Sequence, residues 1–143
     1  LTGVAVQRVD STDSVADADI VITASRAKDP LFAGDRIKEG AFVAAIGSSL
    51  PHTRELDDAA LARASMIAVE WKKQSLQEAG DLVLAAPSLN VASKVVELGD
   101  LVSGKLTAPS HAKGITLYKA VGVGLEDIAL AGLAYENYQK QSA

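Results

Sequence analysis

The sequence contains no cysteine, so neither a disulfide bond nor a thiolate metal site can form in this chain. Aromatic residues make up only 4% of it, and the apolar residues are mostly Ala, Val, Leu and Ile. A chain without cysteine is compatible with a reducing compartment, and a cytoplasmic location is expected.

Long apolar runs and concentrated positive charge are also missing. No run of about 18 apolar residues is present that would cross a membrane, and no charged start followed by an apolar stretch marks a signal peptide. The net charge is −4, and Lys72-Lys73 is the densest basic spot. We therefore expect neither a nucleic-acid partner nor a membrane partner.

The chain does have the composition of a globular domain. Its 143 residues are 48% hydrophobic and suit one domain with a substantial core. Apolar and β-branched runs predict five strands, over residues 4–9, 20–24, 42–46, 66–69 and 115–121. Helices are expected over residues 14–18, 56–64, 71–79, 90–102 and 125–138. This alternation predicts an α/β fold with a parallel sheet.

Small and hydroxyl-bearing residues follow two successive predicted strands. Thr23-Ala24-Ser25 ends one of them, and Gly47-Ser48-Ser49 follows the next. In open α/β sheets ligands bind at the carboxyl ends of the strands. Small residues let the backbone approach a dinucleotide, and hydroxyls bond its ribose or amide groups. The same residues are also common in plain turns, so both interpretations stay open.

Other candidate motifs are weaker. Gly122-Val123-Gly124 follows a strand, but Asp127 stands where a dinucleotide loop needs its third small residue, which favours a tight turn. No Gly-Lys-Ser/Thr phosphate loop occurs. His52 and His111 lack the spacing of a metal pair. His52 follows a strand end, where it would orient a substrate or transfer a proton.

Two charged pairs are expected to be structural. Arg54-Glu55 is interpreted as a structural pair, and Glu126-Asp127 is expected to serve the start of the last helix.

Three stretches, residues 18–25, 47–58 and 115–127, together with residues 78–81 and 97–100, follow one another in a recognisable order. In this order they resemble the ornithine cyclodeaminase/mu-crystallin family, over essentially the whole chain. The resemblance implies a Rossmann-like lobe that binds NADPH or NADH, and a second lobe that forms a homodimer and supplies much of the substrate site.

The resemblance also assigns site residues. It places the cofactor against residues from three strand ends: Thr23, Ala24, Ser25, Ile46, Gly47, Ser48, Val121 and Gly122. Ser49 would lie near the nicotinamide and the substrate, with Lys119 beside Val121, and His52 is the second candidate catalytic residue.

The residue type at position 49 distinguishes the activities of the family. Cyclodeaminases carry an Asp at this position, and a serine lacks a group that exchanges protons near neutral pH. Imine reduction needs less acid–base chemistry from the protein, because the nicotinamide supplies hydride and the protein mainly aligns the reactants. The expected function is NAD(P)H-dependent reduction of a cyclic imino acid such as Δ1-pyrroline-2-carboxylate. The alternatives are an ornithine cyclodeaminase or alanine dehydrogenase activity, or a non-catalytic NADPH-dependent protein that binds a small ligand.

The family's Gly-rich phosphate loop and its first two strands have no counterpart in the sequence. If residues 4–9 form strand 3 of the order 3-2-1-4-5-6, the sheet lacks strands 1 and 2, a gap of about 10 Å. Residues 1–143 are therefore expected to be the C-terminal portion of a Rossmann domain, without the dimerisation lobe. The chain is expected to be unstable alone and to act as an enzyme only with a preceding segment, or else to pair its exposed edges with another chain.

Overall fold

The computed structural model describes residues 3, 5–9, 12–109 and 114–141. The strands are β1 (Ile20–Thr23), β2 (Phe42–Ala45), β3 (Ala64–Val69), β4 (Val95–Glu97) and β5 (Ile115–Lys119). The α-helices are α1 (Asp58–Arg63), α2 (Lys72–Glu78), α3 (Gly80–Val83), α4 (Leu98–Val102) and α5 (Gly124–Gln141). Short 3-10 helices are η1 (Thr12–Ala16), η2 (Gly34–Arg36), η3 (Pro87–Leu89) and η4 (Val91–Ser93).

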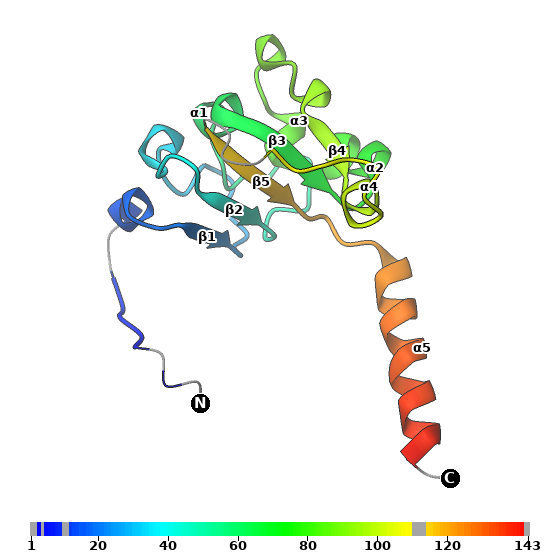
Figure 1. Ribbon diagram of the computed structural model, residues 1–143. Coiled ribbons are helices and arrows are strands. Elements are labelled where there is room, and N and C mark those ends of the chain that lie inside the picture. Colours follow the sequence, from blue (N-terminus) through cyan, green and yellow to red (C-terminus); the bar gives the residue numbers. More distant parts are fainter. Residues whose placement is uncertain (1–2, 4, 10–11, 110–113, 142–143) are drawn as a thin grey trace.

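In the described part of the chain the five strands form one parallel sheet in the order β1-β2-β5-β3-β4 (Figure 1). Strands that run in parallel need crossover connections, and helices supply them here. The predicted α/β class with a parallel sheet is thereby confirmed.

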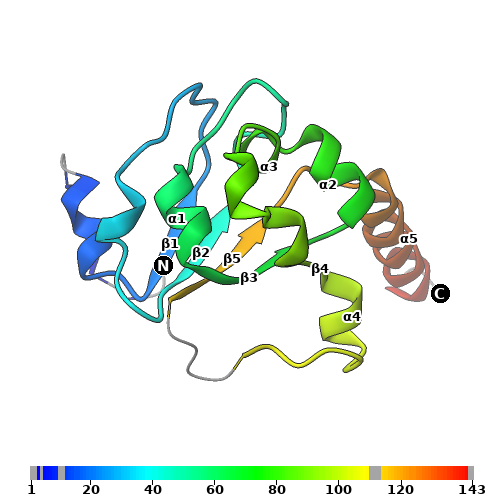
Figure 2. The ribbon, with the colours of Figure 1, turned by 90° about the horizontal axis from the view of Figure 1, so that it is seen from above.

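One face of the sheet carries the core. The register aligns a row of buried side chains across all five strands: Val21, Val43, Leu117, Ile67 and Val95. Helix α3 lies on this face, since Lys119 of the next row reaches Asp81. Figure 2 shows α1, α2 and α3 on the same side of the sheet and α4 on the other.

The opposite face is largely open. The side chains of Ile20 and Ile22 are 63% and 65% exposed, and Phe42 is 40% exposed. A cavity of about 480 Å³ remains between this face and α4, lined by Met66, Leu98 and Leu101 among others. Parallel sheets are normally covered on both faces, so this open face is unusual for a sheet of this type.

The predicted strand over residues 4–9 is wrong. The described residues of this segment, 5–9, form no strand, and Val6 is 93% exposed. A strand needs a neighbour for its N–H and C=O groups, and the segment runs away from the sheet in Figure 1. The expected gap in the sheet is therefore wrong as well: the strands are contiguous, with β1 at a free edge.

The prediction of a single helix over residues 90–102 is also wrong, because the middle of this range forms a strand. Asn90 adopts a left-handed conformation with φ of 44°, η4 follows, and Val95–Glu97 form β4 before α4 begins. Val95 and Val96 are β-branched, and pairing with β3 buries Val95 to 2% exposure. Edge pairing thus overrides the helical periodicity.

The other predicted helices are confirmed with shifted ends. The side chain of Asp57 accepts a hydrogen bond from Ala60 N and caps the start of α1. Helix α1 ends at Arg63, and β3 begins at the next residue, Ala64. Helix α2 ends at Glu78, and Gly80 begins α3 directly after the cap residue Ala79. The short helix near residue 14 is a 3-10 helix that starts at Thr12.

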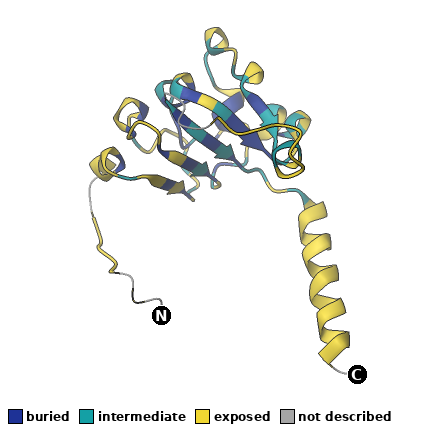
Figure 3. Cartoon of the chain, in the orientation of Figure 1, coloured by how far each residue is buried: buried dark blue, intermediate teal, exposed yellow. Residues whose placement is uncertain are grey.

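Helix α5 extends away from the rest of the molecule (Figures 1 and 3). Its predicted apolar face is solvent-exposed, with Leu125, Ile128 and Leu133 between 54% and 71% exposed. Glu126 and Asp127 lie in its first turn, as expected. No helix in the described ranges is long and apolar enough to cross a bilayer.

Candidate functional site

The carboxyl ends of β1 and β2 lie side by side, because Thr23 pairs with Ala45 in the parallel register. The carboxylate of Glu55 joins the two loops that follow. It accepts hydrogen bonds from Thr23 Oγ1 at 2.9 Å and from Ser25 N at 2.6 Å. It also accepts from Gly47 N at 3.0 Å and, more weakly, from Ser48 N at 3.4 Å. Four predicted cofactor residues therefore converge on one side chain.

Glu55 is fully buried yet ionised. Burial raises the pKa of its carboxyl, but the hydrogen bonds donated by Ser25, Thr23 and Gly47 outweigh it, so the net pKa lies below the ordinary value. A carboxylate that accepts several N–H and O–H bonds has its buried charge satisfied without a cation.

The two loops are also packed against each other. A Cβ added to Gly47 would overlap the backbone of Ser25 and the carboxylate of Glu55, so only glycine fits. Ser48 Oγ donates to Ala27 O at 3.2 Å, and Ala27 N donates to Ser25 Oγ at 3.2 Å. These bonds fix the loops without using the Ser49 hydroxyl.

A second carboxylate holds the end of β5. Glu70 accepts hydrogen bonds from Val121 N at 3.3 Å, from Gly122 N at 3.2 Å and from Tyr118 Oη at 3.3 Å. Gly122 has φ of 82°, a left-handed conformation that glycine adopts readily. Burial and the neighbouring Glu70 raise the pKa of Tyr118 to about 12, so its hydroxyl stays a hydrogen-bond donor.

A buried ion pair lies beneath the loops. Lys119 Nζ is 2.9 Å from Asp81 Oδ2, and both side chains are at most 2% exposed. The two atoms are close enough for an ion pair, but their bond angles do not allow a hydrogen bond between them. The other oxygen of Asp81 accepts from Glu55 N at 2.7 Å and Leu56 N at 2.8 Å. Asp81 thus fixes the backbone that carries Glu55.

Ser49 lines a cavity of about 350 Å³ at the strand ends. Arg26, Gly47, Leu50 and Thr53 line the same cavity, and no carboxylate does so among the described residues. Ser49 is half-buried, and within the described ranges its hydroxyl has no partner. His52 is exposed, two residues beyond the cavity residue Leu50.

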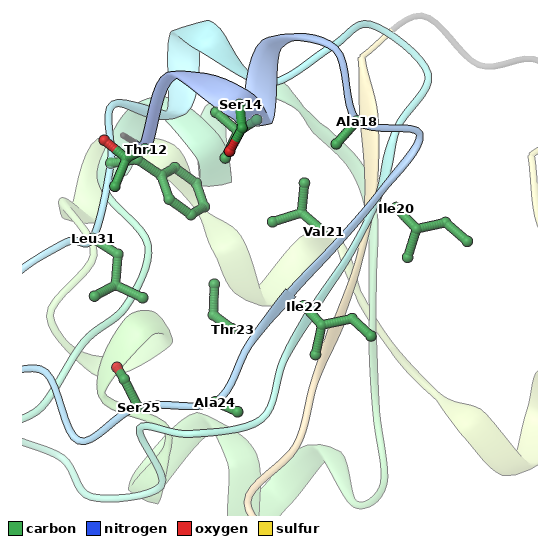
Figure 4. A pocket seen from close by; sticks show the side chains of 12 residues that line it. Thr12, Ser14, Ala18, Ile20, Val21, Ile22, Thr23, Ala24, Ser25 and Leu31 are labelled. Carbon is green, nitrogen blue, oxygen red and sulfur yellow. The ribbon is translucent and has the colours of Figure 1, made fainter. Parts of the chain in front are cut away.

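Another cavity, of about 450 Å³, runs along the free edge of β1. Thr23, Ala24 and Ser25 line it at one end, with Val15 and Leu31 further along (Figure 4). Figure 4 shows Val21 and Thr23 on one side of β1 and Ile20 and Ile22 on the other. Most of this cavity follows the free edge of β1 rather than the strand ends, so the smaller cavity at Ser49 is the better candidate for chemistry.

Sequence reasoning missed the residues that organise the site. Arg54 and Glu55 do not pair with each other, because Arg54 bonds Asp58 at 2.7 Å while Glu55 faces the loops. Glu70 belongs to no motif, and its only signal was its position directly after the predicted strand of residues 66–69. Asp81 ends the 78–81 stretch of the family resemblance, but no role was predicted for it. His111 lies outside the described residues, which contain no group of three His, Asp or Glu able to hold a metal ion.

The chain matches known proteins over most of its length. The family model described as "Ornithine cyclodeaminase/mu-crystallin family" matches residues 2–142. The chain is 34% identical over 126 residues to the ketimine reductase mu-crystallin of Mus musculus, covering 88% of this chain and 38% of that protein.

Two solved structures share the fold. A probable ornithine cyclodeaminase from Bordetella pertussis Tohama I has a TM-score of 0.86 and 59% identity over 90% of this chain. The Thermococcus litoralis Delta(1)-pyrroline-2-carboxylate reductase, solved with NADH and L-proline, has a TM-score of 0.85 and 29% identity over 94% of it. The chain covers 42% of each of these two chains. By sequence and by fold, it belongs to the ornithine cyclodeaminase/mu-crystallin family.

Proposed function

We propose that this chain forms part of an NAD(P)H-dependent reductase of cyclic imino acids, such as Δ1-pyrroline-2-carboxylate. The observation that carries the proposal is the cavity at Ser49, which is lined by a serine and a cation but by no carboxylate among the described residues. Ammonia release from an amino acid needs an acid–base group beside the substrate, whereas reduction of an electrophilic iminium carbon mainly needs alignment.

The strand ends fit the nicotinamide half of a dinucleotide. Gly122 has open space where a Cβ would lie, which lets a flat ring approach its backbone, and Ala24 is exposed. A pyrophosphate fits less well, because Glu55 and Glu70 already accept the backbone N–H groups that would bind it. When bound, the nicotinamide supplies the hydride for the reduction.

The roles of the chain's own residues follow from their positions. Thr23, Ala24, Ser25, Ile46, Gly47 and Ser48 line the cofactor on one side, and Val121 and Gly122 line it on the other. Ser49 is assigned a substrate contact, which its position in the lining of the strand-end cavity supports. His52 is assigned to proton delivery from the exposed rim of the site, and the homodimer and second lobe supply the remaining substrate contacts.

The proposal is tested on the longest native form of this polypeptide. Consumption of NADPH and NADH is followed with Δ1-pyrroline-2-carboxylate, and ammonia release from ornithine and alanine is assayed in parallel. Cofactor consumption without ammonia supports the reductase. Ammonia release without imine reduction overturns it.

A cyclodeaminase is the second candidate, because the 59% identical Bordetella pertussis structure is described as a probable ornithine cyclodeaminase. A non-catalytic protein of the mu-crystallin type is the third. It predicts tight NADPH-dependent binding of a small ligand with no turnover in either assay.

A further inference from the structure

The carboxylate of Glu55 contacts both strand-end loops at the proposed cofactor edge. It is 0% exposed, and its donors come from β1, from the loop after β1 and from the loop after β2. Thr23 and Glu55 lie 32 positions apart in the sequence. A carboxylate in this place therefore links segments that no local interaction would hold together.

The bonds to Glu55 set the polarity of the loops. In a trans peptide unit the N–H and the preceding C=O point in opposite directions, and the described residues contain no cis peptide. Because the N–H groups of Ser25, Gly47 and Ser48 point at Glu55, the carbonyls of Ala24, Ile46 and Gly47 point away from it. The loops therefore present hydrogen-bond acceptors outward.

Outward acceptors select a particular ligand chemistry. A carboxamide NH2 group and ribose hydroxyls donate hydrogen bonds to carbonyl oxygens, whereas phosphate oxygens cannot. This loop arrangement depends on ionised Glu55, because both oxygens of a carboxylate accept hydrogen bonds. The neutral amide of a glutamine at this position would instead point its NH2 group, a donor, at some of the inward N–H groups.

We propose that Glu55 is a positioning residue that turns the loops after β1 and β2 so that their carbonyls receive the nicotinamide riboside end of the cofactor. Asp81 holds the backbone of Glu55, and Lys119 balances the charge of Asp81. Glu55 does not itself touch the cofactor. This role rests on the proposed dinucleotide function.

The test compares Glu55→Gln with Glu39→Gln in the longest native form of the polypeptide. Glu39 is the matched control, since its carboxylate accepts from Gly114 N and Arg63 Nη2 at the opposite end of the sheet. Two quantities are measured: the dissociation constants of NADH and NADPH, and the hydrogen-exchange rates of the amides of Ser25, Gly47 and Ser48.

Glu55→Gln is expected to bind nucleotide about tenfold more weakly and to exchange these three amides about tenfold faster. Glu39→Gln should change neither quantity. Thr23→Val provides a second variant if Glu55→Gln fails to fold. It removes one donor at constant shape and should loosen the same amides to a smaller extent.

The outcomes separate the two proposals. Unchanged amide exchange in Glu55→Gln and in Thr23→Val overturns the positioning role, whether or not nucleotide binds. If the amides exchange faster in the variants but the parent protein binds neither NADH nor NADPH, the loop-orienting role stands and the dinucleotide function is overturned. Faster exchange with unchanged nucleotide affinity overturns the link between the loops and the cofactor.

Discussion

Ser49 is the residue on which the choice between imine reduction and ammonia release depends. Its hydroxyl has no partner among the described residues and faces a cavity without a carboxylate. In the proposed reductase, Ser49 therefore contributes at most one hydrogen bond to the alignment of the imino acid, and not a proton relay.

Replacing Ser49 by Ala should lower kcat/KM for the imino acid roughly three- to tenfold, the worth of one hydrogen bond. The measurement is initial-rate NADH and NADPH consumption, with exposed Ser88→Ala in η3 as the control. A loss of roughly a thousandfold would instead reveal an acid–base role, contrary to the proposal.

Glu55 should make the fold sensitive to acid. Its folded pKa lies below the ordinary value of 4.5, so its stabilisation is complete above that value and is lost as pH falls through the lower, folded pKa. The charged groups nearest to it in the network are Asp81 and Lys119. Urea unfolding from roughly pH 6 to pH 3 should show a steeper loss of stability in the parent than in Glu55→Gln. Equal slopes would contradict this assignment.

Helix α3 is placed by a glycine rather than by its own propensity. Gly80 begins the helix, and a Cβ there would overlap the carbonyl oxygen of Thr53. Because Asp81 follows directly, the contact sets where the buried carboxylate meets Glu55 N and Lys119.

Gly80→Ala should destabilise the protein by about 1–3 kcal/mol through overpacking. Gly99→Ala in α4 is the matched control, because a Cβ there meets no atom within 4 Å. Alanine should leave that helix unchanged or more stable by up to about 1 kcal/mol. Chemical denaturation of both variants gives the comparison, and equal effects would show that Gly80 is not close-packed.

The ion pair between Asp81 and Lys119 joins α3 to β5 in the core. Asp81→Asn keeps the acceptor for Glu55 N but leaves the ammonium of Lys119 buried without a counter-charge. We expect a loss of about 3–5 kcal/mol in the free energy of unfolding. Adding Lys119→Met should recover part of that loss, and a double-mutant cycle by urea denaturation measures it. Strict additivity would mean that the two groups do not interact.

At the scale of the whole molecule, the open sheet face and the exposed α5 indicate an incomplete structure. Ile20, Ile22 and Phe42 on the sheet and Leu125 and Ile128 on α5 are all at least 40% exposed. Apolar area of this extent on parallel strands is normally covered. We propose that residues 1–143 are the C-terminal portion of a Rossmann domain whose other parts cover these surfaces.

Residues 1–143 alone should therefore bind the dye ANS and self-associate, whereas the longest native form should do neither beyond a discrete homodimer. Fluorescence titration and light scattering check the two forms side by side. A monomeric, dye-inert fragment would contradict the expected dependence on further structure.

The sequence alone determined the parts of this protein that depend on local patterns. Runs such as Ile20–Thr23 and Phe42–Ala45 predicted strands, because β-branched and small apolar side chains fit a pleated surface at any position in a sheet. The ordered motifs at 18–25, 47–58 and 115–127 predicted the family, which the match over residues 2–142 confirms.

Only the tertiary structure decided which residues hold the strand ends. Residues 4–9 have a strand-like pattern but no neighbour, and Val95–Glu97 have a helical context but a neighbour in β3. Glu55 meets Thr23 across 32 positions and Asp81 across 26. Periodicity reports the environment of one element, whereas a buried carboxylate is satisfied by donors from several elements. Its role exists only once the sheet has brought them together.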